Sequence, residues 1–362
     1  MMGRVLAYFL AFVPAACIFN GCDDEGNGLD EKTGIFWIEN NSTLVSEDIF
    51  YVSASGDDGQ DGLSESTAFR TLSKALSNLH PGGTVRILPG VYNEGIGMVS
   101  CGSSEAPMTI EGYGGVPTLD GNDEIAIGLY FEMCHHLQIR NLKVANYTDI
   151  GIGFSTGSML VLEELEIAEN GHAVQLKSWE LEGYGIHVDF SEEIEITGCD
   201  VYRNGPDPQK SPDYLMGTGI NTYGNSNVEI TENLSYDNIG GGILVEDSHD
   251  VLVEGNEVYG NDLDATEEEW WDGGLWLDGG AGVIVRDNHF HDNLGPGIQI
   301  SDEDLQNPTG YGLYDNISSG NYYGIFIWNF GTTGWPPESI IKRSGNTFSG
   351  NSRQDIWIED WY

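Results

Sequence analysis

The stretch from Gly242 to Asn261 reads GILVEDSHDVLVEGNEVYGN and contains the unit that recurs through most of this chain. It holds a glycine segment of the form Gly-Ile-x-Val, a second short apolar segment, and an Asn-x-x-x-x-Asn motif at Asn256 and Asn261. Apolar residues alternate with other residues in each segment, and polar residues separate the segments. Such alternation between turn residues is typical of short β-strands. One unit therefore predicts three short strands joined by sharp turns.

The same glycine segment recurs at steps of 34, 34, 23, 32, 23 and 27 residues, and a unit of 23 residues with insertions accounts for all of them. The glycines are Gly151, Gly185, Gly219, Gly242, Gly274, Gly297 and Gly324. The paired asparagines follow at Asn141/Asn146, Asn233/Asn238, Asn256/Asn261, Asn288/Asn293, Asn316/Asn321 and Asn346/Asn351. In two units the first asparagine is replaced, by Leu165 and by Cys199. Self-similarity at a fixed period indicates a repeat architecture.

The repeats predict an all-β fold, a single-stranded right-handed parallel β-helix in which each unit is one rung. A rung cannot bury its apolar positions alone, but its neighbours cover them at about 4.8 Å per rung. The asparagines at one corner should then form an internal ladder of amide hydrogen bonds, and Cys199 should be a buried small residue within it. A β-propeller blade needs about 40 residues, and the consensus of leucine-rich repeats is absent.

A short amphipathic helix is expected over residues 69–79, with Phe69, Leu72, Leu76 and Leu79 on one face. Ser66 or Thr67 can cap its start, and Gly82-Gly83 lies beyond its end. Because an open end of stacked strands invites aggregation, we interpret this helix as the cap of the N-terminal end.

Residues 1–22 are predicted to be an export signal, since Arg4 precedes the apolar run Val5 to Phe19. The following Asn20-Gly21-Cys22 resembles a bacterial lipobox, which predicts lipidation of Cys22; ordinary cleavage nearby is the alternative. Residues 23–47 are acidic and aperiodic and are expected to form a flexible tether. The β-helix is then expected over residues 48–362, with its cap and first rungs in residues 48–125.

Fourteen Lys plus Arg stand against 58 Asp plus Glu, a formal net charge of -44. Such a surface repels nucleic acid and anionic membranes, so the only membrane contact we expect is a lipid anchor on an exported monomer. It also disfavours a polyanionic substrate unless a cation bridges the two. Of the cysteines beyond the signal, Cys101, Cys134 and Cys199 match no zinc-binding spacing, and a Cys101–Cys134 disulfide is compatible with an exported protein.

Three insertions precede the glycine segments and should rise beside the same sheet as the walls of a groove. They are His172–Glu182, Pro206–Leu215 and Asp262–Asp272. Side chains two and four residues past each glycine should point outward into this groove, because side chains alternate along a strand. The first set is His187, Asn221, Leu244, Trp276, Gln299 and Phe326, and the second set is Asp189, Tyr223, Glu246, Asp278, Ser301 and Trp328.

Glu246 and Asp278 should therefore stack on adjacent rungs, with Asp302 close by on the next. Neighbouring strands place carboxylates about 5 Å apart, which matches the separation in retaining glycosidases, whereas skipping a rung gives about 9.6 Å, nearer the inverting range. Mutual repulsion raises the pKa of one carboxyl and makes it a general acid. The same row, widened by Asp189 and Asp247, also suits calcium, which takes about six to eight oxygen ligands. With 58 acidic residues, a solvated acidic face is the third interpretation.

Aromatic side chains on or beside the predicted groove favour a sugar ligand, because flat rings stack on the apolar faces of sugar rings. The candidates are Trp270, Trp271, Trp276, Trp328 and Tyr223. Packing of loops onto the sheet is the alternative role for these rings. His187, Asn221 and Gln299 are the polar candidates for contacts with the substrate.

Two further motifs are familiar. The first resembles the N-terminal segment of the pectate-lyase-like β-helix superfamily and consists of Tyr51-Val52-Ser53, the following Gly-Asp turns and Leu88-Pro89-Gly90-Val91-Tyr92. The resemblance to the superfamily covers about residues 48–362. That resemblance implies export and an activity on polysaccharides, although the superfamily also includes epimerases, adhesins and non-catalytic surface proteins. Gly274-Leu275-Trp276-Leu277-Asp278 is similar to the nucleophile-bearing strand of β-helical xylosidases, whose acid/base lies one rung later. Here that position is Ser301, and the nearest acids are Asp302 and Glu303.

These observations lead to three functional hypotheses. The first is a retaining or inverting glycoside hydrolase of neutral or weakly charged glycans, without a required cofactor. In it Asp278 is the nucleophile or base and Glu246 or Asp302 is the acid. The second is a calcium-dependent polysaccharide lyase with Lys177 or Lys210 as the base and an acidic calcium site. The ligands of that site would be Asp189, Glu246, Asp247 and Asp278. The third is a non-catalytic surface protein that binds glycan.

Overall fold

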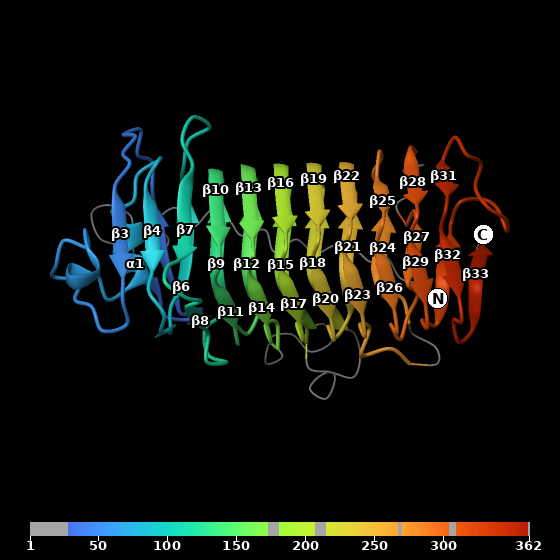
Figure 1. The fold of residues 1–362 in the computed structure, drawn as a ribbon, viewed down its shortest axis with the longest axis horizontal. Helices are drawn as coiled ribbons and strands as arrows, with labels where there is room; N and C mark the ends of the chain where they lie inside the picture. Colours follow the sequence, from blue (N-terminus) through green and yellow to red (C-terminus); the bar gives the residue numbers. More distant parts are fainter. Residues whose placement is uncertain (1–27, 173–180, 207–214, 267–269, 304–308, 361–362) are drawn as a thin grey trace.

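The computed structural model describes residues 28–172, 181–206, 215–266, 270–303 and 309–360. Over these residues the chain winds into a long rod of stacked rungs that runs from β3 at one end to β33 at the other (Figure 1). Each complete rung contributes one strand to each of three sheets, and every strand pair is parallel except β1 with β2. The predicted right-handed parallel β-helix is therefore confirmed.

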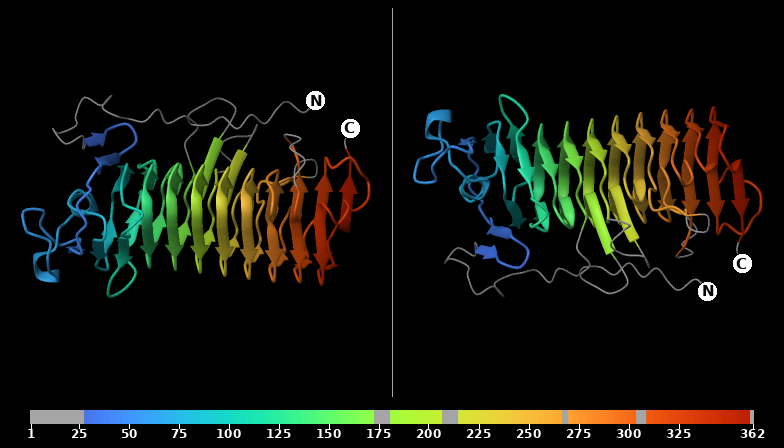
Figure 2. Two further views of the ribbon diagram at one scale, coloured as in Figure 1. Left: turned by 90° about the horizontal axis from the view of Figure 1, so that it is seen from above. Right: turned by 90° about the horizontal axis from the view of Figure 1, so that it is seen from below.

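Sheet A is formed by the glycine segments and follows chain order along the rod. Within the described residues its strands are β1 (Gly28–Asp30), β2 (Ile35–Glu39), β6 (Gly95–Val99), β9 (Ile127–Glu132), β12 (Ile150–Ser155), β15 (Leu181–Asp189), β18 (Leu215–Tyr223), β21 (Gly241–Glu246), β24 (Leu275–Asp278), β27 (Ile298–Ser301), β30 (Tyr323–Trp328) and β33 (Gln354–Glu359). The long strands β15 and β18 project beyond the rod where the first two insertions were predicted (Figure 2).

Sheet B carries the second apolar segment of each unit. Over the same described ranges its strands are β3 (Ile49–Val52), β4 (Thr84–Ile87), β7 (Met108–Gly112), β10 (His135–Arg140), β13 (Ser158–Glu163), β16 (Glu192–Thr197), β19 (Ser226–Thr231), β22 (His249–Glu254), β25 (Ile284–Arg286), β28 (Tyr311–Tyr314) and β31 (Ile341–Ser344).

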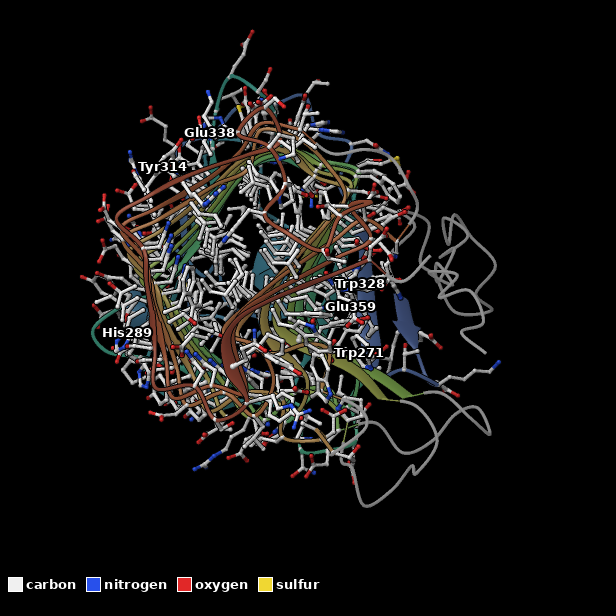
Figure 3. The ribbon with its side chains drawn as sticks, turned by 90° about the vertical axis from the view of Figure 1, so that its right-hand side faces the viewer. Trp271, His289, Tyr314, Trp328, Glu338 and Glu359 are labelled. Atoms are coloured by element: carbon white, nitrogen blue, oxygen red, sulfur yellow. A yellow bond between two sulfur atoms is a disulfide. The ribbon has the colours of Figure 1, made fainter. Side chains whose placement is uncertain are left out.

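Sheet C carries the short segments between the paired asparagines. Its described strands are β5 (Val91–Tyr92), β8 (Thr118–Asp120), β11 (Lys143–Ala145), β14 (Glu166–Ala168), β17 (Asp200–Tyr202), β20 (Leu234–Tyr236), β23 (Glu257–Tyr259), β26 (His289–His291), β29 (Ile317–Ser319) and β32 (Thr347–Ser349). Seen along the rod, the three sheets surround one continuous interior, with Trp328 of sheet A and His289 of sheet C on opposite sides (Figure 3).

The interior is filled by the positions one and three residues past each glycine. Ile186 pairs with Ile220 and Ile220 with Ile243, and none of the three has any exposed surface. Burial of each such side chain contributes about 1.5–3 kcal/mol. Because these positions face inward, the positions two and four residues past the glycine face outward, as the alternation predicts.

Asparagine ladders run along two corners of the rod rather than the one corner that the sequence suggested. The first ladder contains the first asparagine of each motif, and the second ladder contains the second. In the second ladder, Asn204 Nδ2 donates to Asn238 Oδ1 at 3.1 Å, and Asn238 Nδ2 donates to Asn261 Oδ1 at 2.9 Å. The first ladder comprises Asn233, Asn256, Asn288, Asn316 and Asn346. The second ladder comprises Asn170, Asn204, Asn238, Asn261, Asn293, Asn321 and Asn351.

Asn141 and Asn146 do not belong to these ladders, although they share the motif. They have φ angles of 54° and 60°, a left-handed turn conformation that asparagine tolerates well. The positions that bury are one residue later, at Leu142 and Tyr147, and Tyr147 N–H donates to Asn170 Oδ1 at 3.1 Å. Two asparagines five residues apart therefore form part of the ladders only when they occupy the buried corner positions. Asn141 and Asn146 lie one residue before those positions.

Cys199 occupies the first ladder, as predicted. Its side chain is buried, and its backbone N–H donates to Asn233 Oδ1 at 2.9 Å. Burial raises the pKa of the Cys199 thiol to about 12, so the thiolate that a nucleophile requires is scarce at neutral pH.

The predicted cap helix is present but shorter, since α1 spans only Leu72–Leu76. Thr71 is its N-cap, and the Thr71 side chain accepts a hydrogen bond from Lys74 N–H. The predicted caps, Ser66 and Thr67, belong instead to a separate turn of 3-10 helix, η1 (Glu65–Thr67). Asp58 accepts from the Thr71 N–H and hydroxyl, which fixes the helix start through a contact 13 residues away in sequence. Among the described residues, no helix is long and apolar enough to cross a membrane.

The predicted tether over residues 23–47 is wrong for its central part. β1 and β2 form an antiparallel pair, and β2 aligns in parallel with β6 at the end of sheet A. Ile35, Trp37 and Ile38 are buried there, because the first rung needs apolar cover. The start of the chain through residue 27, including Cys22, lies outside the described residues.

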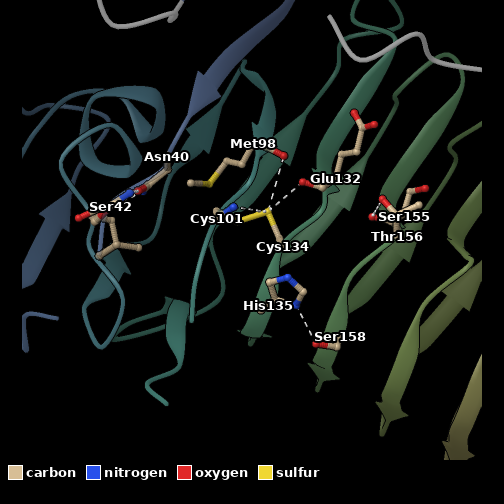
Figure 4. The surroundings of a disulfide bond; sticks show 11 residues. Asn40, Ser42, Met98, Cys101, Glu132, Cys134, His135, Ser155, Thr156 and Ser158 are labelled. Atoms are coloured by element: carbon tan, nitrogen blue, oxygen red, sulfur yellow. Dashed lines mark hydrogen bonds between the residues drawn. A yellow bond between two sulfur atoms is a disulfide. The ribbon is translucent and has the colours of Figure 1, made fainter. Parts of the chain in front are cut away.

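Cys101 and Cys134 form a disulfide near the N-terminal end of sheet A (Figure 4). Both cysteines are buried and 33 residues apart. The bond closes a loop of one rung, which restricts the unfolded chain.

Replacing both Cys101 and Cys134 with alanine should lower the free energy of unfolding by about 3–4 kcal/mol, as expected for a loop of this size. The measurement is thermal unfolding followed by circular dichroism. A reducing agent should shift the midpoint of the native protein toward that of the double variant and leave the variant unchanged. Equal midpoints for native and variant proteins would show that the bond adds nothing to stability.

Candidate active site

The outward face of sheet A aligns the predicted site residues in two columns. In the first column, His187 pairs with Asn221, Asn221 with Leu244, Leu244 with Trp276, Trp276 with Gln299, and Gln299 with Phe326. In the second column, Asp189 pairs with Tyr223, Tyr223 with Glu246, Glu246 with Asp278, and Asp278 with Ser301. The predicted register is confirmed, so Glu246 and Asp278 are neighbours on adjacent strands.

Asp278 is the most strongly perturbed carboxyl of these columns. Its side chain is only 8% exposed, and burial raises its pKa to about 6, with Asp247 and Asp302 adding to the increase. Two donors oppose this effect: the Ser301 hydroxyl lies 2.7 Å and the Glu303 N–H 3.0 Å from Asp278 Oδ1. A carboxyl with a pKa near 6 exchanges a proton readily at neutral pH.

A directed chain of hydrogen bonds orients Asp278. Trp276 Nε1 donates to Ser301 Oγ at 2.7 Å, and an indole nitrogen can only donate. The Ser301 hydroxyl hydrogen is therefore available for Asp278 Oδ1. Ser301 occupies the position where the xylosidase-like motif predicts the acid/base, and in this chain it is a hydrogen-bond donor to Asp278 instead.

Further groups crowd around Asp278. Asp302 is buried, while Glu246 and Asp247 are partly exposed. The buried Tyr311 hydroxyl donates to the Gly279 carbonyl oxygen, and burial together with these aspartates raises the Tyr311 pKa far above its usual value. A Cβ at Gly279 would lie 2.3 Å from Asp247 Oδ1, and the φ of 64° at this position also favours glycine. Sequence reasoning missed Tyr311 because it belongs to sheet B.

Sequence reasoning also missed a cluster of three aspartates in the third insertion. Asp262, Asp264 and Asp272 each place an oxygen within 4.8 Å of the others. Burial, together with the nearby Asp264 and Glu303, raises the pKa of Asp272 to about 8. The Asp-x-Asp pair followed by Asp272 was visible in the sequence, but nothing there showed that the ends of the insertion meet.

Two of the predicted aromatic platforms show the packing that was the alternative role for these rings. Trp270 and Trp328 are only 7% and 5% exposed, because they pack with Tyr323, Phe326 and Trp357 over the C-terminal end of sheet A. Trp271 stacks on Trp270 at 4.8 Å between ring centroids, and Trp271 and Trp328 lie on the same side of the rod (Figure 3). Trp271, Trp276 and Tyr223 are half-buried and remain accessible to a ligand.

Asn221 and Gln299, predicted to bind substrate, are buried in this structure. Neither polar atom of the Gln299 side chain has a hydrogen-bond partner, and Asn221 Oδ1 has none either. His187 lies 3.2 Å from Asn221 Nδ2 through its Nδ1 atom and packs on the Tyr184 ring at 4.9 Å. Burial lowers the pKa of His187, which favours the neutral imidazole.

The predicted calcium ligands do not form one cluster. Asp189 lies on β15, separated from Asp278 on β24 by β18 and β21, which places it about 14 Å away at strand spacing. Asp189 instead interacts with Tyr130, Glu132 and His187. Lys177 and Lys210, the predicted lyase bases, lie outside the described residues, as does most of the first two predicted walls.

Similarity to known proteins agrees with this architecture. The model of a right-handed β-helix region matches residues 115–262 and 182–352. No curated protein matches the chain. Among solved structures, the pectate lyase Pel9A has a TM-score of 0.61 and 17% identity, covering 86% of this chain and 79% of its own.

Two other structures are similar at comparable levels. A GH136 lacto-N-biosidase from Eubacterium ramulus has a TM-score of 0.56 and 15% identity over 86% of this chain and 67% of its own. An alginate lyase from Paenibacillus sp. has a TM-score of 0.54 and 14% identity over 85% of this chain and 99% of its own. At these identities the likeness concerns the fold. The family model matches more than half of the length of this chain, and the chain therefore belongs to the right-handed β-helix family.

Proposed function

We propose that this protein is a glycoside hydrolase that cleaves a neutral or weakly charged glycan on the outward face of sheet A. The observation that carries the proposal is Asp278, a buried carboxyl with a pKa of about 6 that is held by Ser301 and aligned with Glu246 on the next strand. The named activities of similar folds, a pectate lyase, a lacto-N-biosidase and an alginate lyase, support a carbohydrate substrate.

The spacing of the two carboxyls favours a retaining mechanism. Neighbouring parallel strands lie about 4.8 Å apart, and the carboxyls of retaining enzymes are about 5–5.5 Å apart. The sequence-based hypothesis made Asp278 the nucleophile or base. Its raised pKa favours the acid/base role instead, with Glu246 as the nucleophile.

In the first step, Asp278 donates its proton to the glycosidic oxygen as the C1–O bond breaks, and a Glu246 oxygen forms a bond to C1. In the second step, Asp278 accepts a proton from water, the water oxygen bonds to C1, and Glu246 leaves as a carboxylate. Each group returns to its starting state. Trp271, Trp276 and Tyr223 are the half-buried rings available to hold neighbouring sugars.

The net charge of -44 disfavours a polyuronate, which would be repelled by the surface. An extracellular glycan is also in keeping with the predicted export signal and the predicted lipidation of Cys22. The substrate class we propose is therefore a neutral extracellular oligosaccharide or polysaccharide.

The deciding experiment incubates the protein with neutral and uronate-containing glycans, with and without chelator, and measures new reducing ends beside ultraviolet absorbance. Reducing ends without absorbance on a neutral glycan are expected. An unsaturated product that needs a divalent cation would make the protein a lyase. Binding without any product would leave a glycan-binding surface protein.

The pH dependence of hydrolysis should show a descending limb near pH 6. An acid must be protonated to act, so activity falls as the pH rises through the pKa of Asp278, about 6. Ser301→Ala removes a donor that favours the ionised carboxyl, so the pKa rises and the limb moves to higher pH. The measurement is kcat/KM against pH for both proteins; an identical limb in the variant would exclude Asp278 as the titrating group.

A further inference from the structure

Three carboxylates meet where the third insertion leaves and rejoins the rod. Asp262 and Asp264 follow the ladder residue Asn261, and Asp272 precedes β24. The start of the insertion is anchored to the preceding rung, since Asp262 N–H donates to the Gly240 carbonyl at 2.7 Å and Asp264 N–H to the Ile239 carbonyl at 3.1 Å. The cluster therefore has a defined backbone as well as convergent oxygens, all within 4.8 Å of one another.

Asp262 provides a second, independent observation. Its side chain is only 2% exposed, and its Oδ2 atom has no hydrogen-bond partner. Throughout the part of the chain that the structure describes, neither Asp262 nor Asp272 forms an ion pair with Lys, Arg or His. The Asp262 carboxyl also interacts with the Asp264 side chain and the Gly273 N–H. A buried carboxylate without a positive partner is costly, and either an added proton or a bound cation removes that cost.

The glycine at position 295 leaves the space that one of these oxygens occupies. A Cβ at Gly295 would lie 2.1 Å from Asp262 Oδ2, the oxygen that has no partner, and 2.7 Å from the Trp270 carbonyl oxygen. The segment before β27 therefore packs closely on the Asp262 carboxylate.

We propose that Asp262, Asp264 and Asp272 bind a divalent cation of the calcium type. The ligands are all carboxylate oxygens, which hard cations prefer, and three carboxylates can supply up to six of the oxygens that Ca²⁺ takes. Mg²⁺ demands a stricter octahedral geometry and retains several waters, so Ca²⁺ is the better match for three clustered side chains.

The cation ties the beginning of the insertion to its end. Trp270 and Trp271 immediately precede Asp272, so the same bond fixes the rings that cover the C-terminal end of sheet A. Asp272 also interacts with Glu303, whose N–H donates to Asp278. The site stabilises this region whether or not the protein hydrolyses glycans.

The test titrates the metal-free protein with Tb³⁺, exciting tryptophan and recording terbium emission, because Trp270 and Trp271 are adjacent to the ligands. The salt concentration is kept high so that binding to the acidic surface is weak. Ca²⁺ and Mg²⁺ are then added as competitors, and the thermal midpoint is measured with and without Ca²⁺.

We expect one tight class of Tb³⁺ site that Ca²⁺ displaces better than Mg²⁺, together with a higher thermal midpoint in Ca²⁺. Asp262→Asn combined with Asp272→Asn should weaken Ca²⁺ binding at least about 30-fold, because the charge of the ligands sets the affinity. Glu195→Gln combined with Glu229→Gln removes two exposed carboxylates that are paired on sheet B and should bind as the native protein does.

The proposal is overturned if the native protein shows no tight site and no shift of its midpoint in Ca²⁺. It is also overturned if the double aspartate variant, folded by circular dichroism, keeps native affinity. Should that variant fail to fold, Asp264→Asn at the half-buried ligand decides instead, and unchanged Ca²⁺ affinity there counts against the site. Binding is measured directly, so a failure of the proposed hydrolase leaves this result untouched.

Discussion

Replacing Asp278 with asparagine should lower kcat/KM on the glycan substrate by a factor of about 10²–10⁴, the usual contribution of a general acid or base. Asparagine keeps the size of the side chain and its hydrogen bonds to Ser301 and Glu303, but it can neither donate the proton nor accept it back. The fold should survive, since the change removes a buried charge rather than creating one.

Chemical rescue separates the two proposed roles. With an Asp278→Ala variant, azide should restore turnover of a substrate with a good leaving group and give a glycosyl azide of retained configuration. With a Glu246→Ala variant, azide should give the inverted product, because it replaces the nucleophile. Glu229→Gln on sheet B is the control and should keep native activity. Native activity in Asp278→Asn would remove this residue from the mechanism.

Replacing Asn238 with leucine should lower the free energy of unfolding by about 2–5 kcal/mol, because it leaves buried donors without partners. Asn238 Oδ1 accepts from both Asn204 N–H and Asn204 Nδ2, at 3.0 and 3.1 Å, and its own amide donates to Asn261. Leucine has a similar volume but can make none of these bonds. The loss falls in the middle of the rod, where both neighbouring rungs depend on the ladder.

Thermal and denaturant unfolding measure this effect. Asn41→Leu is the matched control, since Asn41 is exposed and its substitution should change the free energy of unfolding by no more than about 0.5 kcal/mol. If Asn238→Leu unfolds at the native midpoint, the ladder contributes no net stability and the rungs are held together by apolar packing alone.

Much of this architecture could be predicted because the unit repeats. Once the rungs are recognised, equal positions must stack, so the pairs Glu246–Asp278 and Trp276–Gln299 follow from counting. The inward positions follow in the same way, because side chains alternate along a strand. The buried Cys199 follows from its place in the asparagine series.

Prediction failed where a contact depends on residues from different rungs or from outside the repeats. The cap helix is limited to Leu72–Leu76, and its start is fixed by Asp58 together with Glu94, which accepts from the Leu72 and Ser73 N–H groups. β2 joins sheet A although its sequence has no repeat. The local pattern of polar and apolar residues does not show which distant residues will contact the helix or β2.

The sequence by itself determined the rung, the register of its strands and the carboxyls that stand side by side on sheet A, because identical units bury their apolar positions only when stacked in register. Only the tertiary structure decided which outward side chains stay accessible. Trp328 and Gln299 share the face of Trp276, yet both are buried. It also decided that Ser301 and Glu303 hold Asp278 and that Asp262 meets Asp272, since burial and charge depend on every segment that packs against a site.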